Sequence, residues 1–123
     1  MATRSLKNNG KFIFTTLNGL FPLFHSVEAL SPGTTGEGKA TYHSNQFDLM
    51  TFRDSKIVEV EDDSGNKKVL FSNERYYVPS EISWLLKSLG YNKVEIFGAK
   101  LGTFSRKDKL ATSDFEMLVV ANK

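Results

Sequence analysis

Residues 79–90 read PSEISWLLKSLG, and this stretch decides the fold that the sequence predicts. Proline suits the first position of a helix, because its missing N–H group would have no hydrogen-bond partner within the helix there. A glycine at the far end, Gly90, takes the left-handed conformation that ends many helices. Four apolar residues follow the spacing of one helix face: Ile82, Leu85, Leu86 and Leu89. The stretch therefore predicts an amphipathic helix with one buried apolar stripe.

Strands are expected on both sides of this helix. Residues 93–97 (KVEIF) and 115–121 (FEMLVVA) read as two strands after it, and the polar, glycine-containing segment 98–114 connects them. Before the helix, residues 12–17 (FIFTTL) form a nearly continuous apolar and β-branched run. Such a run is typical of a strand buried on both faces, as in the interior of an α/β sheet. Residues 19–30 predict a short, weak helix or an irregular segment, because a proline interrupts them.

A β-hairpin is expected in the middle of the chain. Residues 57–61 (IVEVE) and 67–71 (KKVLF) have the composition of paired strands, and residues 62–66 (DDSGN) between them have the composition of a turn. Acidic residues on the first arm lie opposite lysines on the second, which adds modest charge pairing across the strands. We interpret residues 31–74 as a loop and hairpin inserted into a single domain over residues 1–123.

Three stretches of the sequence resemble class I S-adenosylmethionine-dependent methyltransferases. Residues 6–14 (LKNNGKFIF) are similar to the family's approach to its fifth strand, although Asn8 and Asn9 stand where proline and glycine are usual. Residues 75–91 look like the family's last helix with the glycine–aromatic turn after it, and residues 114–123 look like its final strand. Each motif alone occurs widely, so the order and spacing of the three carry the resemblance.

The resemblance implies an α/β fold: a partial Rossmann-like methyltransferase sheet, made of the carboxy-terminal strands and the last helix, with an inserted β-hairpin. It also implies that the strands of residues 93–97 and 115–121 pair antiparallel, with the last strand inserted beside that of residues 12–17. The implied function is that of the carboxy-terminal, substrate-binding lobe of a methyltransferase that acts on a small molecule.

The same resemblance bears on the cofactor. The family binds S-adenosylmethionine through a Gly-rich loop after its first strand and an acidic residue at the end of its second strand, because such a loop lets the backbone and a helix N-terminus approach the ligand. This chain begins after these features. The resemblance therefore implies no cofactor-binding residue in this chain, and we expect the isolated chain to be inactive.

Four residues are candidates for substrate binding. The resemblance places Arg75, Tyr76 and Tyr77 beside the family's substrate pocket, where an arginine can hold a carboxylate or phosphate and a tyrosine can orient a nucleophile. The alternative is a hairpin end with one packed tyrosine and an arginine paired to an acidic residue. Asn18 directly follows the strand of residues 12–17, at the carboxyl end where α/β sheets place ligand groups. Its alternative is an ordinary turn asparagine before Gly19.

Other motifs argue against competing functions. The formal net charge is +2, which gives no strong electrostatic case for nucleic acid. An aspartate interrupts the basic residues Arg106, Lys107 and Lys109, and no ladder of aromatic residues accompanies them, so we expect no nucleic-acid binding. The chain has no cysteine, and His25 and His43 lack the spacing of paired metal ligands, so we expect no metal site.

The loop of residues 33–39 has the letters GxxxxGK of a phosphate-binding loop, but Ala40 replaces the serine or threonine that would bind Mg²⁺. No strand pattern precedes this segment and no helix pattern follows it, so we interpret it as an ordinary loop. His25 as a general base is a weaker interpretation than a packed or surface histidine, because no orienting partner is evident. Glu59, Glu61 and the aspartates after them lack the spacing of a calcium loop, so we interpret them as a solvated hairpin arm.

Two further interpretations stay open. The chain is either part of an enzyme or a non-enzymatic domain that binds a small ligand or a partner, and a stand-alone hairpin-and-helix scaffold is a third possibility.

No apolar run is long enough to cross a membrane and no apolar signal core precedes Lys11, so we expect a cytoplasmic protein without membrane contact. With no preceding strand, one edge of residues 12–17 is open. We therefore expect a homo-oligomer or association with a missing amino-terminal half.

Overall fold

The computed structural model describes residues 5–25, 39–100 and 102–123. The chain forms two compact units, the first made of Met1–Phe24 and Tyr77–Lys123 and the second of His25–Tyr76. The second unit lies in the sequence between the two parts of the first, and its range is wider than the predicted insertion 31–74. Whether residues 1–123 behave as a single domain stays a prediction.

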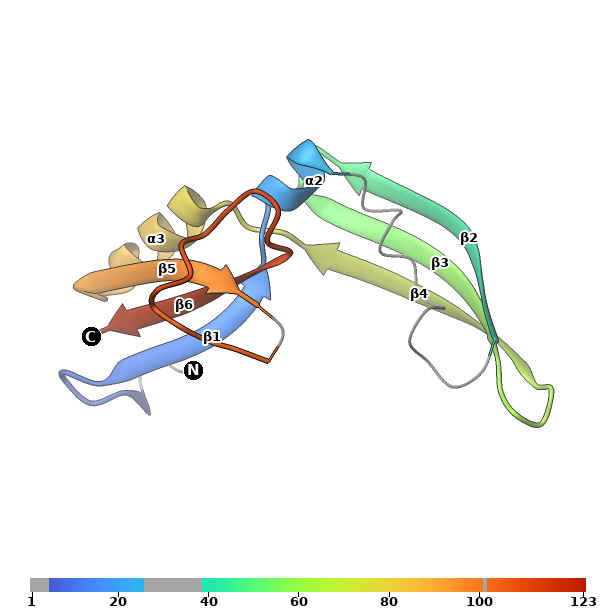
Figure 1. The fold of residues 1–123 in the computed structure, drawn as a ribbon, viewed down its shortest axis with the longest axis horizontal. Coiled ribbons are helices and arrows are strands. Elements are labelled where there is room, and N and C mark those ends of the chain that lie inside the picture. The colour runs from blue at the N-terminus through green and yellow to red at the C-terminus, as the bar shows by residue number, and fades with distance from the viewer. Residues whose placement is uncertain (1–4, 26–38, 101) are drawn as a thin grey trace. The chain divides into compact units, whose positions relative to one another are not determined.

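The first unit contains a three-stranded sheet in which the last strand lies in the middle. Its strands are β1 (Lys11–Leu17), β5 (Lys93–Ala99) and β6 (Glu116–Asn122), in the order β1-β6-β5 (Figure 1). β6 is antiparallel to both of its neighbours. The expectation of an α/β fold in which the last strand is inserted beside the first is confirmed.

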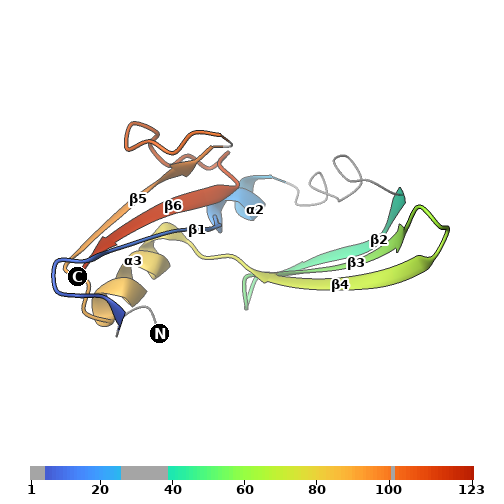
Figure 2. The same cartoon turned by 90° about the horizontal axis from the view of Figure 1, so that it is seen from below.

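Helix α3 (Pro79–Ser88) covers one face of this sheet (Figure 2). The register places Phe12 opposite Ala121 and Phe14 opposite Val119, all four on the face that packs against the helix. The opposite face carries Ile13, whose side chain is 59% exposed. The prediction that β1 is buried on both faces is therefore wrong. Among the described residues, a helix covers only one face of this strand.

The core of the first unit is small and continuous. It consists of six buried residues, contributed by α3, the turn after it and β6: Ile82, Leu86, Tyr91, Met117, Val119 and Ala121. Val119 and Met117 are completely buried, because β6 has a strand on each side of it. The alternation of side chains along β6 thus directs every second residue into the contact with α3.

Helix α3 begins and ends close to the predicted positions, but its buried stripe is narrower than predicted. Gly90 has φ of +100°, which confirms the predicted left-handed stop. Ile82 and Leu86 are buried, whereas Leu85 is 37% exposed and Leu89 is 50% exposed. Helical spacing identifies the apolar side of a helix, but the width of the surface beneath it decides how much of that side is covered. A three-stranded sheet covers only the centre of the stripe.

The second unit is a separate antiparallel sheet in which β2 (Lys39–Asp48), β3 (Arg53–Glu61) and β4 (Lys67–Arg75) follow one another. The predicted hairpin is β3 with β4, and β2 adds a third strand on the other side of β3. Asp62 closes the turn, because its side-chain Oδ1 accepts hydrogen bonds from the backbone N–H groups of Ser64 and Asn66. Gly65 adopts φ of +84° in this turn, which favours glycine.

Between β1 and the insertion, the short helix α2 (Leu20–Phe24) lies within the segment 19–30 where a weak helix was predicted. Residues 26–30 of that segment lie outside the described residues. Within the described part of the chain, no helix is long and apolar enough to cross a membrane.

We predict that Leu86→Ala lowers the free energy of unfolding by about 2–5 kcal/mol, because it removes a side chain that is 5% exposed from the contact between α3 and the sheet. Leu89→Ala is the matched control on the same stripe, where the half-exposed side chain predicts a change near 0.5 kcal/mol. Urea denaturation followed by circular dichroism measures both. Equal effects of the two substitutions would show that α3 packs through a different face.

Candidate functional site

Asn18 lies at the carboxyl end of β1, as the sequence predicted, and its side chain is completely buried. Its Nδ2 donates hydrogen bonds to the backbone oxygens of Asp114, at 2.8 Å, and Ala111, at 3.3 Å. Its Oδ1 accepts a hydrogen bond from the N–H of Leu20, at 3.0 Å. These contacts correspond to the turn interpretation, in which Asn18 joins the end of β1 to the segment before β6. A contact between Asn18 and a substrate stays a prediction.

Tyr77 lies beside the same end of β1 and is joined to it by its backbone. Its N–H donates to the oxygen of Leu17 at 3.2 Å, and its own oxygen accepts from the N–H of Gly19 at 2.8 Å. A side-chain carbon on Gly19 would lie 3.0 Å from the backbone of Tyr77, so this close approach favours glycine. The structure thus brings two of the four candidate residues, Asn18 and Tyr77, together in the first unit.

Tyr76, the next candidate, belongs to the second unit and is completely buried. Its N–H donates to the oxygen of Phe52 at 2.8 Å, and its ring meets that of Phe47 edge-to-face, with centroids 5.7 Å apart. Arg75 ends β4, and its Nη1 donates a hydrogen bond to the backbone oxygen of Tyr76. These contacts correspond to the alternative in which a tyrosine packs at the hairpin end. Substrate binding by Arg75 or Tyr76 stays a prediction.

A buried ion pair lies on the same sheet. Asp54 and Lys56 occupy the buried face of β3, and Lys56 Nζ lies 3.1 Å from Asp54 Oδ2. Burial, with the negative charges of Asp54 and Glu74, raises the pKa of Tyr76 well above its ordinary range. The phenol of Tyr76 therefore stays protonated near neutral pH, which suits it to donate a hydrogen bond and not to act as a base.

The sequence did not predict the burial of Asp54 and Lys56. Polar residues that alternate along a strand usually face solvent, and on this strand the exposed set consists of Arg53, Ser55 and Ile57. The sequence does contain a signal for the buried face, in the difference between the two alternating sets of residues along β3. The set of Asp54 and Lys56 continues with two valines, Val58 and Val60, whereas the exposed set has one apolar residue, Ile57, so a small excess of apolar residues marks the buried face.

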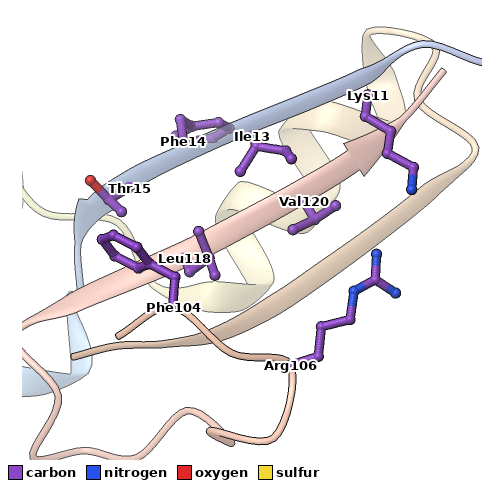
Figure 3. A pocket seen from close by; sticks show the side chains of 8 residues that line it. All are labelled: Lys11, Ile13, Phe14, Thr15, Phe104, Arg106, Leu118 and Val120. Atoms are coloured by element: carbon purple, nitrogen blue, oxygen red, sulfur yellow. The ribbon is translucent and has the colours of Figure 1, made fainter. Parts of the chain in front are cut away.

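The open face of the first sheet carries a hollow of about 440 Å³ (Figure 3). Ile13, Leu118 and Val120 line it with apolar surface, and Lys11 and Arg106 extend toward it from β1 and from the loop after β5. The guanidinium of Arg106 lies 3.4 Å from Glu95, so this arginine is already paired within the unit. An apolar site with a cationic end suits an amphipathic anion, and its volume falls within the range of small-molecule pockets.

The remaining motifs that the sequence analysis considered either lie at exposed or ion-paired positions or fall outside the described residues. His25 is exposed at the end of α2, and the basic loop after β5 pairs part of its charge through Arg106 with Glu95 and Lys100 with Asp108. The GxxxxGK segment, residues 33–39, lies outside the described residues except for Lys39, and His43 lies in β2. Within the described part of the chain, no group of three histidine, aspartate or glutamate side chains is placed to hold a metal ion.

No protein-family model and no curated protein matches this sequence. Among solved structures, the CcbJ methyltransferase from Streptomyces caelestis aligns with a TM-score of 0.65 at 19% identity, over 98% of this chain and 49% of that protein. An S-adenosylmethionine-dependent methyltransferase from Clostridium acetobutylicum aligns with a TM-score of 0.68 at 18% identity, over 98% of this chain and 47% of its own. The chain has part of a methyltransferase fold. It spans about half the length of the solved structures that it matches.

We predict that Asn18→Ala destabilises the chain by about 1–3 kcal/mol, because it removes the side-chain hydrogen bonds to the buried oxygen of Asp114 and to the partly buried N–H of Leu20. Asn92→Ala is the matched control, since Asn92 is exposed in the turn before β5 and predicts a change within about 0.5 kcal/mol. Thermal and urea unfolding measure the difference. An unchanged midpoint for Asn18→Ala would contradict the structural role and favour a role in ligand binding.

Proposed function

We propose that this chain is the carboxy-terminal, substrate-side lobe of a cytoplasmic S-adenosylmethionine-dependent methyltransferase that acts on a small molecule. In this proposal the lobe lacks the cofactor-binding half and is inactive alone. The observation that carries it is the strand order β1-β6-β5 with β6 antiparallel to both neighbours, in a chain whose fold aligns with two methyltransferases. The alignment covers about half of each of those proteins, so a second half of similar size is needed to complete the fold.

The residues present do not fit a site for S-adenosylmethionine. A dinucleotide-type or methyl-donor site needs a strand followed by a Gly-rich turn and the N-terminus of a helix. In the described residues, β1, Gly19 and α2 have that order, but α2 has five residues, and Tyr77 and Val78 fill the space next to Gly19. The sequence also contains no GxGxG motif. Cofactor binding is therefore assigned to the other half of the enzyme.

In the intact enzyme, we assign this lobe the task of holding the methyl acceptor. The candidate groups for acceptor contacts are Asn18 after β1 and Tyr77 before α3 in the first unit, and Arg75 and Tyr76 in the second unit. In the intact enzyme the reaction would be methyl transfer to the acceptor by an in-line displacement. Positioning supplies much of the rate in such a step, and positioning the acceptor is the role that we assign to this lobe.

A second candidate function is a non-enzymatic domain that binds a small ligand or a partner. The hollow of about 440 Å³ on the open sheet face, with Lys11 at one end, is the observation that favours it. The two candidates differ in what the neighbouring coding sequence must contain. An upstream segment with a strand followed by GxGxG supports the enzyme, and its absence from the reading frame and its neighbour supports the binding domain.

We predict that the isolated chain does not bind S-adenosylmethionine with micromolar affinity, because no strand–glycine–helix element among the described residues has room for it. Isothermal titration calorimetry measures the binding directly. The Clostridium acetobutylicum methyltransferase, titrated under the same conditions, is the positive control. A saturable isotherm for the isolated chain in the micromolar range would contradict the assignment of the cofactor to the other half.

A further inference from the structure

Strand β4 forms an exposed edge of the second unit. The sheet order is β2-β3-β4, so β4 pairs on one side with β3 and the described residues place no strand on its other side. The centre of the strand is apolar and lies in solvent, with Val69 50%, Leu70 48% and Phe71 76% exposed. Ile57 of β3 lies opposite Phe71 and is 36% exposed, so the apolar surface continues across both strands. An apolar edge of this kind favours pairing with another strand.

β4 carries Lys67 and Lys68 before its apolar centre and Glu74 and Arg75 after it. Lys68 precedes the apolar centre and Glu74 follows it, and both side chains are exposed. The register of the hairpin places Glu74 directly opposite Asp54, so two carboxylates face each other across β3 and β4. Asp54 has its own cation in Lys56, and no ion pair of Glu74 or of Lys68 occurs among the residues that the structure describes. Within the described part of the chain, no cation therefore offsets this repulsion at Glu74.

Antiparallel geometry limits how β4 can pair with a second copy of itself. Residues that face each other in an antiparallel pair either both direct their N–H and C=O groups toward the partner or both direct them away. In a pair of two identical strand edges, two residues therefore face each other only if both residue numbers are odd or both are even. Lys67 has an odd number and Glu74 an even one, so these two residues cannot face each other across the interface. Lys68 and Glu74 both have even numbers, so they can. The register that brings Lys68 opposite Glu74 centres the two-fold axis on Phe71.

We propose that two copies of this chain associate through β4, antiparallel about a two-fold axis at Phe71, to form one continuous six-stranded sheet. Each Lys68 then faces the Glu74 of the other copy, and because the axis repeats the contact, both carboxylates gain a cation at once. The two Phe71 side chains meet on the exposed face, next to Ile57 of each copy. Lys67 faces Arg75 in this register, and each is engaged within its own chain, Lys67 with Glu59 at 3.7 Å and Arg75 with the oxygen of Tyr76.

The other strand edges fit a second copy less well. The end of β1 is bridged by Tyr77, whose backbone pairs with Leu17 and Gly19, and β1 has no acidic residue to complement Lys11. The edge of β5 is partly covered by the loop after it, since the N–H of Gly98 donates to the oxygen of Asp108 at 2.9 Å. β2 carries a shift of register between Tyr42 and Ser44, and such irregularities disfavour edge pairing. We therefore place the proposed association at the edge of β4, and association through the edge of β1 stays a prediction.

The test uses charge reversal on the full chain. Lys68→Glu alone and Glu74→Lys alone each turn two attractive pairs into two repulsive ones, so each is expected to raise the dissociation constant of the dimer by roughly tenfold or more. An equimolar mixture of the two variants restores both attractive pairs, as does the double variant Lys68→Glu/Glu74→Lys. Light scattering and sedimentation equilibrium measure the mass, which is twice 13.8 kDa for the dimer. We expect dimers for the wild type, the mixture and the double variant.

Two control variants isolate the site. Asp63→Lys changes the net charge as Glu74→Lys does, but Asp63 lies in the turn between β3 and β4, outside the proposed strand pairing, so the mass is expected to stay that of the dimer. Ile13→Lys places a charge on the exposed face of β1 and is also expected to leave the dimer intact. Lys68 and Glu74 are exposed, so we expect their variants to stay folded, and circular dichroism of each variant checks this.

Three results would overturn the proposal. The first is a wild-type mass of 13.8 kDa from micromolar to millimolar concentration. The second is a dimer that Ile13→Lys dissociates while the β4 variants do not, which places the interface on β1. The third is a failure of the mixed variants to dimerise when each alone has lost the dimer. None of these results bears on cofactor binding, so the proposed methyltransferase function is tested separately.

Discussion

The first unit depends on the antiparallel pairing of β6 with two strands that do not pair with each other. β1 and β5 belong to distant parts of the chain, and β6 alone joins them into a sheet. Five consecutive residues of β6 are buried, because strands flank it on both edges and α3 covers one of its faces. The position of Asn18 at the end of β1 also depends on this pairing, since its hydrogen bonds reach the segment that leads into β6.

The second unit is held by different means. Its strands follow one another along the chain, so each pairing is local, and its buried face includes the ion pair of Asp54 and Lys56. A buried ion pair contributes little net stability, because removing two charges from water costs about as much as their attraction returns. It does fix the register of β3. A slip by one residue would expose the pair and bury Arg53 and Ser55 in its place.

The sequence predicted those features that short-range rules determine. Proline and glycine mark both ends of α3, and the aspartate–glycine turn of residues 62–66 marks the hairpin, because each of these residues satisfies a local backbone requirement. The exposure of Leu85 and Leu89 was not predictable, since it depends on the width of the sheet beneath the helix. The same holds at the candidate site. The place of Asn18 followed from the end of a strand, whereas the burial of Tyr76 depends on contacts that strand alternation alone does not specify.

The central place of β6 has a consequence for the order in which the chain folds. Hydrogen-bonded neighbours in the second unit are close in sequence, so its hairpin can form while the remainder of the chain is still being synthesised. β1 is made before the second unit, α3 and β5, and its strand partner β6 is made only after all of them. The edge of β1 therefore stays without its native strand partner until β6 has been made. During that interval the first strand is the segment most in need of a chaperone, and a nascent chain that ends before β6 has no means of protecting it.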